Sequence, residues 1–271
     1  MDDKTPLAIP LTNGTIPATR YGNGEKLLIA IHGYDDSQTE MQPLAKTAAT
    51  EKKYTVYTLN LPYHGDETDW KTDVFSATDC RELIEAIRTR EPNLPHFDLI
   101  GYSLGGRVVQ SVLPLLAQKP RILYLLAPAG APQNPWHPYL KTPLFYKKMM
   151  ATLAQNPSWI IQLGKLIRQL KLISSFQLAF AEKQLGDAAY RKKMFFWWQS
   201  LHYLPLNYPQ IQDSIAFNKI TVHLLFGKKD IVIPKKSPIF FEKMLRPASI
   251  EYVNRGHRGV QACAANWLKN L

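Results

Sequence analysis

The sequence has only two cysteines, Cys80 and Cys263, among its 271 residues. They stand far apart and fit neither the spacing of a metal site nor that of a redox pair, so we expect two free, partly buried thiols. Also lacking are an apolar run long enough to span a bilayer and the basic start and apolar stretch of a secretory signal. These absences predict a soluble, cytoplasmic protein.

Acidic residues are scarce relative to basic ones, and the formal net charge is +11. The excess is concentrated between Ala129 and Asp213, where ten Lys and Arg residues stand against three acidic residues. Nucleic-acid-binding motifs, zinc spacings and a Walker-type phosphate loop are missing, so we expect no nucleic-acid partner and no metal site. A weak contact between this basic segment and an anionic membrane remains open.

Short apolar runs alternate with helical patterns along most of the chain. The runs predict buried strands at Leu27–Ile31, Tyr54–Leu59, Phe97–Ile100, Ile122–Leu126, Thr221–Phe226 and Ser249–Val253. The helical patterns begin at Ser37, which is in capping-box spacing with Glu40, and continue at Ala77–Arg90, Arg107–Gln118, Ser237–Leu245 and a last helix through Trp267. This alternation predicts an α/β fold in which helices flank a mostly parallel central sheet.

The alternation stops after Pro128 and resumes near residue 214. The intervening sequence is punctuated by prolines, and its helix-like stretches are Leu140–Gln155, Trp159–Leu172 and Gly186–His202. We interpret residues 129–213 as a helical insertion over one end of the sheet. Residues 1–128 and 214–271 would then form a single core domain.

The strongest local motif is Gly101-Tyr102-Ser103-Leu104-Gly105, between an apolar strand and a helical run. In a strand-to-helix elbow the serine takes a strained backbone conformation, and the flanking glycines remove side chains that would clash. Such a turn lifts the Ser103 hydroxyl above the sheet, at a helix N-terminus where backbone N–H groups stabilise an oxyanion. The motif predicts a nucleophilic serine; the alternative is a tight glycine turn.

Three other segments supply candidate partners for Ser103. Asp230 follows a buried strand and could orient a histidine, or could cap the helix that begins near Pro234. His257 stands in a glycine-flanked loop and completes the chain order Ser, Asp, His. The loop at His32 and Tyr34 could supply one oxyanion donor; the backbone N–H groups of Tyr34 and Leu104 are the candidates, and His32 more simply braces the loop.

With these segments the whole chain resembles the α/β-hydrolase superfamily, in the branch with a helical cap inserted after the sixth strand. The resemblance rests on the oxyanion segment at residues 32–34, the elbow at 101–106, the acid turn at 227–234 and the histidine segment at 256–257. The segment at residues 60–65 also resembles the family pattern acid-x-Pro-Gly-His-Gly. Here Asn60 replaces the acid and Tyr63 the glycine, and His64 is expected to stabilise the loop.

The resemblance implies a serine hydrolase of carboxylic esters or thioesters that forms an acyl-enzyme on Ser103 without a cofactor. His257 would be the general base and Asp230 its orienting acid. The serine at the elbow argues against epoxide and haloalkane hydrolysis, because those members of the family use an aspartate nucleophile. Open alternatives are a lipid ester hydrolase at an anionic membrane, an acyltransferase, a C–C bond hydrolase and a non-catalytic small-molecule receptor.

The aromatic residues of the insertion suggest an apolar acyl or aryl pocket, although most are expected to form the core of the insertion itself. The candidate substrate contacts are His32, Tyr102, Trp136, Phe195 and Trp198.

Overall fold

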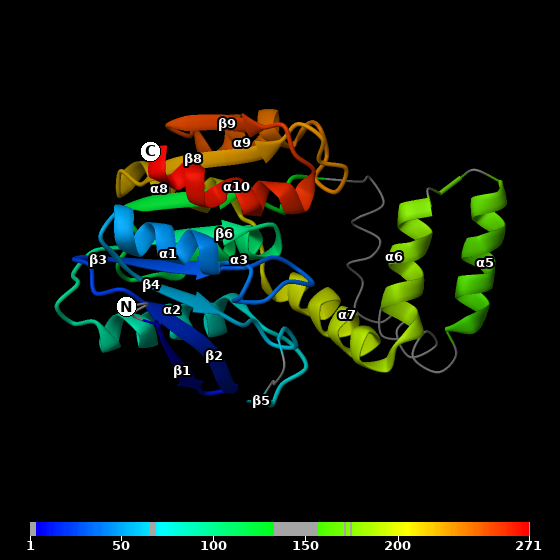
Figure 1. The fold of residues 1–271 in the computed structure, drawn as a ribbon, viewed down its shortest axis with the longest axis horizontal. Coiled ribbons are helices and arrows are strands. Elements are labelled where there is room, and N and C mark those ends of the chain that lie inside the picture. Colours follow the sequence, from blue (N-terminus) through cyan, green and yellow to red (C-terminus); the bar gives the residue numbers. More distant parts are fainter. Residues whose placement is uncertain (1–3, 66–68, 133–156, 171, 174, 271) are drawn as a thin grey trace. The chain divides into compact units, whose positions relative to one another are not determined.

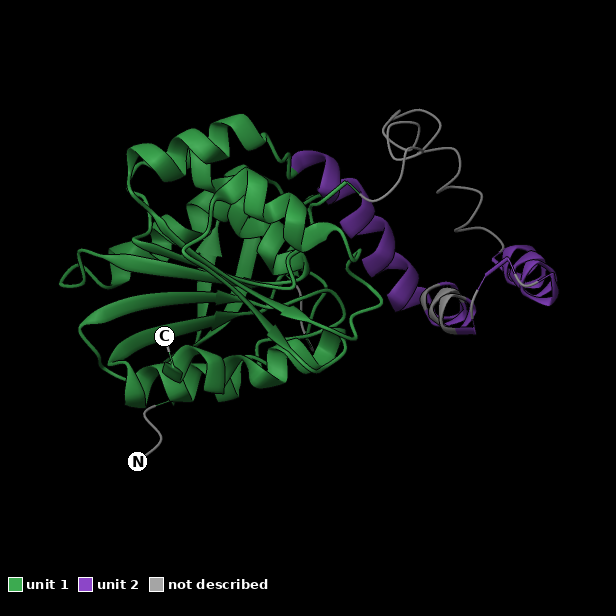
Figure 2. Cartoon of the chain, turned by 90° about the horizontal axis from the view of Figure 1, so that it is seen from above, with its two compact units in different colours: residues 1–132, 204–271 green, residues 133–203 purple. Residues whose placement is uncertain are grey.

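The computed structural model describes residues 4–65, 69–132, 157–170, 172–173 and 175–270. These residues form two compact units, residues 1–132 with 204–271 (unit 1) and residues 133–203 (unit 2) (Figure 2). The predicted insertion at 129–213 contains the whole of unit 2, whose ends lie four and ten residues inside those bounds.

A twisted nine-stranded sheet forms the centre of unit 1 (Figure 1). Its strands are β1 (Lys4–Leu11), β2 (Gly14–Tyr21), β3 (Lys26–Ile31), β4 (Tyr54–Leu59), β5 (Asp69–Trp70), β6 (Phe97–Tyr102), β7 (Ile122–Leu126), β8 (Thr221–Gly227) and β9 (Ser249–Val253). The order is β1-β2-β4-β3-β6-β7-β8-β9, and β5 pairs with β2. Strands β4 to β9 along this order are parallel, whereas β1 and β2 are antiparallel to their neighbours. The predicted mostly parallel sheet is confirmed.

Helices cover both faces of this sheet. The helices of unit 1 are α1 (Gln42–Glu51), α2 (Ala77–Arg90), α3 (Leu104–Val112), α8 (Tyr208–Phe217), α9 (Ser237–Leu245) and α10 (His257–Asn270), with the short 3-10 helix η1 (Leu113–Leu115). Helices α1 and α10 pack side by side on one face, and α2 and α3 pack together on the other (Figure 1). Strands β4 and β6 are buried along their full length, because each lies between two neighbouring strands and two helical layers.

Unit 2 is helical in its described part. It contains α5 (Ser158–Gln169), α6 (Ser175–Gly186), α7 (Ala188–Ser200) and the 3-10 helix η3 (Leu201–Tyr203). Leu185 and Met194 form a small buried cluster against which Ile160, Ile161 and Phe195 pack. The predicted helix at 140–155 lies outside the described residues.

Three predicted helix boundaries were wrong. Ser37 and Glu40 do form a hydrogen bond, but they lie in a series of turns that precedes the helix. Helix α1 begins only at Gln42, and Pro43 favours a helix start at this point. Helix α3 ends at Val112 because Pro114 follows it. The stretch at 186–202 is not one helix: Gly186 ends α6, α7 covers Ala188–Ser200, and residues 201–202 belong to η3. Asp187 caps α7, and its Oδ1 accepts the N–H groups of residues 189 and 190.

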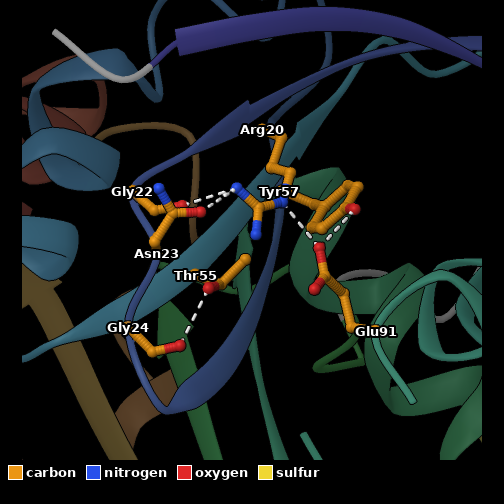
Figure 3. A network of polar contacts seen from close by, with 7 residues as sticks. All are labelled: Arg20, Gly22, Asn23, Gly24, Thr55, Tyr57 and Glu91. Atoms are coloured by element: carbon orange, nitrogen blue, oxygen red, sulfur yellow. Dashed lines mark hydrogen bonds and ion pairs between the residues drawn. The ribbon is translucent and has the colours of Figure 1, made fainter. Parts of the chain in front are cut away.

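A polar network ties β2 and β4 to the end of α2 (Figure 3). Arg20 donates from Nε to Oε1 of Glu91 at 2.6 Å, and the Tyr57 hydroxyl donates to the same oxygen at 2.8 Å. Arg20 also donates to the carbonyl of Gly22 and to Oδ1 of Asn23 at 2.7 and 2.8 Å. Burial acts to raise the pKa of Glu91, but the hydrogen bonds from Arg20 and Tyr57 and the charge of Arg20 outweigh it and hold that pKa below its usual value.

No helix among the described residues is long and apolar enough to cross a bilayer. Both cysteines are free: Cys80 is fully buried, and Cys263 is partly exposed.

Candidate active site

The loops that follow β3, β6, β7 and β8 all leave the same edge of the sheet, because these strands are parallel. Ser103 stands at this edge between β6 and α3, with φ 50° and ψ −110°. Its N–H donates to the carbonyl of Leu126 at 2.9 Å, and its own carbonyl accepts the N–H of Ala129 at 2.9 Å. These two bonds to the end of β7 hold the strained elbow in place.

Glycines let the backbone turn sharply at this elbow. A Cβ atom added at Gly105 would lie 2.2 Å from the carbonyl oxygen of Ile31, and one added at Gly101 would lie 2.5 Å from that of Gly105. Both contacts are with backbone atoms that cannot move aside independently. The glycines on either side of Ser103 are therefore required by close approach of the chain to itself.

A continuous chain of hydrogen bonds starts at the Ser103 hydroxyl. Oγ lies 2.9 Å from Nε2 of His257, and Nδ1 of His257 lies 2.7 Å from Oδ2 of Asp230. The other oxygen of Asp230 accepts the N–H groups of Val232 and Ile233 at 2.8 and 2.9 Å. The three residues named from the sequence thus lie in contact, in the order required for a nucleophile, a base and an orienting acid.

The Asp230 carboxyl is almost fully buried. Burial acts to raise its pKa, but the hydrogen bond from His257, the two backbone N–H donors and the charge of His257 together hold the pKa below its usual value. Asp230 is therefore a carboxylate at neutral pH. A carboxylate at this place keeps the proton of the neutral imidazole on Nδ1, which leaves Nε2 to accept the serine proton.

His257 is the first residue of α10 and not, as expected, part of a glycine loop. The loop after β9 ends at Gly256, and Gly259 already belongs to the helix. A Cβ atom at Gly259 would lie 2.6 Å from the Cβ of Arg255, so this glycine serves close packing of the turn. The helix fixes the backbone that carries the imidazole.

The segment after β3 runs directly beside the elbow. A Cβ atom at Gly33 would lie 2.8 Å from two ring carbons of Tyr102, and the Gly105 Cβ position lies 2.5 Å from the carbonyl oxygen of His32. Leu104 is the first residue of α3, so its N–H has no acceptor within the helix. The segment before Tyr34 therefore passes close to the elbow that carries Leu104, and the role of these two residues as oxyanion donors stays a prediction.

Two buried histidines brace this segment. Nε2 of His32 accepts the N–H of Leu61 at 3.1 Å, and its Nδ1 lies 2.7 Å from the carbonyl oxygen of Gly33. The ring of His64 is 4.9 Å from that of His32, and its Nδ1 lies 3.0 Å from the carbonyl oxygen of Pro62. His32 has no exposed surface and both of its nitrogens are engaged within the protein, which supports the bracing role and not a substrate contact.

The departures from the family pattern at residues 60–65 have physical consequences. Oδ1 of Asn60 accepts the N–H of Gln38 at 2.7 Å, a bond that a carboxylate could make equally. Tyr63 has φ 61°, a left-handed conformation that favours the glycine of the pattern. A Cβ atom at Gly65 would lie 2.3 Å from Nδ2 of Asn60, so the last glycine of the pattern is needed here too.

The remaining candidate substrate contacts differ in burial and in the unit to which they belong. Tyr102 is buried, with its ring 5.2 Å from that of His257, so it supports the histidine from within the protein. Phe195 packs within unit 2, and Trp198 is 36% exposed. Trp136 lies outside the described residues.

One carboxyl group near the site was missed in the sequence. Asp36 lies in the loop after Gly33 and interacts electrostatically with His257. The only signal for Asp36 in the sequence is its position three residues after Gly33, close to the predicted oxyanion segment. Among the residues placed by the structure, no group of three His, Cys, Asp or Glu side chains could hold a metal ion.

Comparisons with known proteins agree with this architecture. Residues 28–265 match the model of the Alpha/beta hydrolase family. The fold is similar to a thioesterase domain from the curacin biosynthetic pathway (TM-score 0.67, 16% identity, 99% of each chain covered). It is also similar to a putative lipase from Acinetobacter baumannii AYE (TM-score 0.61, 19% identity, 99% of this chain and 89% of that chain covered). A third similar structure is the haloalkane dehalogenase DatA from Agrobacterium tumefaciens C58 (TM-score 0.66, 13% identity, 99% of this chain and 96% of that chain covered). No curated protein sequence matches the chain.

Proposed function

This chain belongs to the α/β-hydrolase family, and from that premise we propose that it is a serine hydrolase that cleaves carboxylic esters or thioesters. The observation that carries the proposal is the unbroken series of hydrogen bonds from Ser103 through His257 to Asp230. A series of this kind activates a hydroxyl that would otherwise be a weak nucleophile at neutral pH.

In the first half of the proposed reaction, His257 takes the proton of Ser103 as Oγ attacks the carbonyl carbon of the substrate. The N–H groups of Tyr34 and Leu104 would stabilise the oxyanion, and loss of one such donor typically costs about a hundred- to a thousandfold in rate. The imidazolium then gives its proton to the leaving alcohol or thiol. The product is an acyl-enzyme on Ser103.

In the second half, His257 removes a proton from water, which attacks the acyl carbonyl. Collapse of the second tetrahedral intermediate returns the proton to Ser103 and releases the carboxylic acid. Asp230 stays ionised throughout and stabilises the imidazolium each time it forms. These residues complete the cycle without a cofactor.

The serine nucleophile distinguishes the proposed ester hydrolysis from the haloalkane and epoxide hydrolysis carried out by other members of the family. Haloalkane and epoxide hydrolysis by family members require an aspartate at the elbow, because its carboxylate forms the alkyl ester intermediate. Ser103 occupies that position here. We therefore place this chain with the esterases and thioesterases of the family.

We assign substrate selection to the predicted cap at residues 129–213. The chain enters this segment from the end of β7, where Ala129 is hydrogen-bonded to the carbonyl of Ser103. We propose that the insertion supplies an apolar acyl or aryl pocket. Phe195 and Trp198 stay candidate substrate contacts on the basis of the sequence alone. A cytoplasmic location remains a prediction.

One surface favours a second candidate, hydrolysis of a lipid ester at an anionic membrane. On α5, Trp159, Leu163 and Leu166 recur at helical spacing, and Leu170 follows at the C-cap of the helix; these side chains are each 45–64% exposed. The helix also carries Lys165 and Arg168 and no acidic residue. An apolar stripe with basic neighbours is typical of interfacial helices.

Release of p-nitrophenol from p-nitrophenyl esters, acetate through palmitate, tests the proposal. We expect turnover by the natural protein and its loss in Ser103→Ala. Ser111→Ala is a matched control, because Ser111 is a buried serine of α3 that donates to the carbonyl of Val108, within the same helix. Turnover that persists in Ser103→Ala would refute the assigned nucleophile. A preference for long acyl chains that increases with anionic vesicles would favour the lipid ester candidate.

A further inference from the structure

Asp36 places a second carboxyl group beside the candidate active site. Its N–H donates to the carbonyl of Gly33 at 3.4 Å, so residues 33–36 turn back on themselves. A Cβ atom added at Gly33 would lie 3.2 Å from Oδ2 of Asp36 and 2.8 Å from two ring carbons of Tyr102. The carboxyl group and the tyrosine ring therefore both lie close to Gly33, and they interact electrostatically.

Tyr102 connects this position to the catalytic histidine. Its ring centroid is 5.2 Å from that of His257, at an interplanar angle of 33°. Asp36 and His257 thus lie around the same tyrosine ring and interact electrostatically. Asp230 reaches His257 separately, through the hydrogen bond to Nδ1.

The charged and titratable neighbours of Asp36 come from three elements. Its own loop supplies Asp35 and Glu40, α10 supplies His257 and Arg258, and β6 supplies Tyr102. Nη2 of Arg258 lies 3.9 Å from Oδ2 of Asp35, so the positive charge of Arg258 acts on Asp35 as well as on Asp36. Burial, with the repulsion of Glu40 and Asp35, raises the pKa of Asp36 to about 6, against the opposing charges of Arg258 and His257.

We propose that Asp36 is a positioning residue that acts through His257, its negative charge stabilising the imidazolium that forms during acyl transfer. The proposal rests on the proposed function of His257. In the proposed mechanism the imidazole acquires a positive charge as it takes the proton of Ser103, so a nearby anion stabilises the transition state more than the ground state. Unlike Asp230, Asp36 would do this without a hydrogen bond to the imidazole, whose two nitrogens are engaged by Asp230 and Ser103.

The proposal predicts a specific dependence on pH. Below the pKa of Asp36 the carboxyl group is neutral, and Asp36→Asn should behave like the natural protein. Above it the natural protein gains an anion that the variant lacks. The ratio of the two kcat/KM values should therefore rise from about one at pH 5 to roughly three- to tenfold at pH 8, the size expected for one partly screened charge.

Two measurements test the inference. The first is kcat/KM of the natural protein, Asp36→Asn and Asp36→Glu between pH 5 and pH 8.5 with one ester substrate. Asp36→Glu keeps the charge and should retain most of the rise. A ratio that is the same at every pH, whatever its size, would mean that Asp36 only supports the loop, and would overturn the proposal.

The second measurement needs no turnover, and so separates failure of this inference from failure of the proposed function. The imidazole signals of His257 are assigned by NMR from their loss in His257→Gln and are followed against pH in the natural protein and in Asp36→Asn. We expect the midpoint of the His257 titration to lie at lower pH in Asp36→Asn. Midpoints that coincide would overturn the proposal even if the protein hydrolyses esters.

Discussion

Nε2 of His257 lies 2.9 Å from the hydroxyl oxygen of Ser103, although 154 positions separate the two residues in the chain. The contact arises because Ser103 is fixed at the end of β6 and His257 at the start of α10. The carboxyl edge of the parallel sheet brings these ends together. The arrangement depends on the architecture of the whole unit, so changes remote from Ser103 can disturb it.

Replacement of Asp230 by Asn should strongly reduce activity. The amide keeps the shape of the side chain but lacks the charge that holds the Nδ1 proton of His257 and stabilises the imidazolium. We expect kcat with a p-nitrophenyl ester to fall on the order of 10³- to 10⁴-fold. A fall of less than tenfold, with the fold intact by circular dichroism, would contradict the role given to Asp230.

A methyl group at Gly105 should be poorly tolerated, because its Cβ would approach the carbonyl oxygen of Ile31 to 2.2 Å. We expect Gly105→Ala to lower the free energy of unfolding by about 3 kcal/mol or more. Gly186→Ala is the control, since no atom lies within 4 Å of the added Cβ there, and it should change stability by no more than about 1 kcal/mol. Calorimetric unfolding of both variants checks this, and equal stability of the two would be inconsistent with the elbow geometry.

The contribution of Glu91 to stability should depend on pH. Its pKa is lower in the folded protein than its ordinary value of 4.5, so the stabilisation is present above that value and is lost as the pH falls through the folded pKa. Because the Glu91 side chain is partly exposed and therefore screened by solvent, Glu91→Gln should lower the free energy of unfolding by only about 0.5–1 kcal/mol at pH 7. The difference should disappear at acidic pH, as Glu91 of the natural protein becomes protonated and neutral like the glutamine. Thermal unfolding at pH 7 and pH 3.5 measures the difference, with Glu85→Gln on the same helix as control. A cost that is unchanged at pH 3.5 would rule out the linkage.

The two thiols should react at very different rates. Burial raises the pKa of Cys80 well above its usual value, whereas Cys263 is partly exposed. Ellman's reagent should therefore modify one thiol per chain in the folded protein and two in denaturant. The variant Cys80→Ser keeps Cys263 and should still show one reactive thiol. No reactive thiol in this variant, or two in the folded natural protein, would conflict with the burial of Cys80.

Ser103 and Asp230 could be named from the sequence because each follows a strand with a strong apolar signal. The prediction of β6 and of the glycines around Ser103 placed the nucleophile, and the strand before Gly227 placed Asp230. Chain order then selected His257 from seven histidines. The structure brings these three side chains together, while their catalytic roles stay predictions.

The hairpin β1–β2 was not predicted, and prolines explain why. Pro6, Pro10 and Pro17 interrupt its strands, a pattern that argues against a central strand. Strand β1 lies at the edge of the sheet, where missing N–H donors are tolerated. The turn residues Asn13 and Gly14 were the available signal for this hairpin.

Asp36 could not have been identified from its own segment. Its surroundings are set by Tyr102, His257 and Arg258, which belong to distant parts of the chain. The location of His257 at the start of a helix was missed for a related reason, because the glycines on either side of it favour a loop when they are considered locally.

The most direct test of the proposed nucleophile is mass spectrometry of the protein after reaction with a fluorophosphonate. The account predicts one adduct per chain, located on Ser103, and formation at least about a hundredfold slower in His257→Gln, because the base no longer activates the hydroxyl. An adduct on another residue, or equal rates in the natural protein and His257→Gln, would contradict the account.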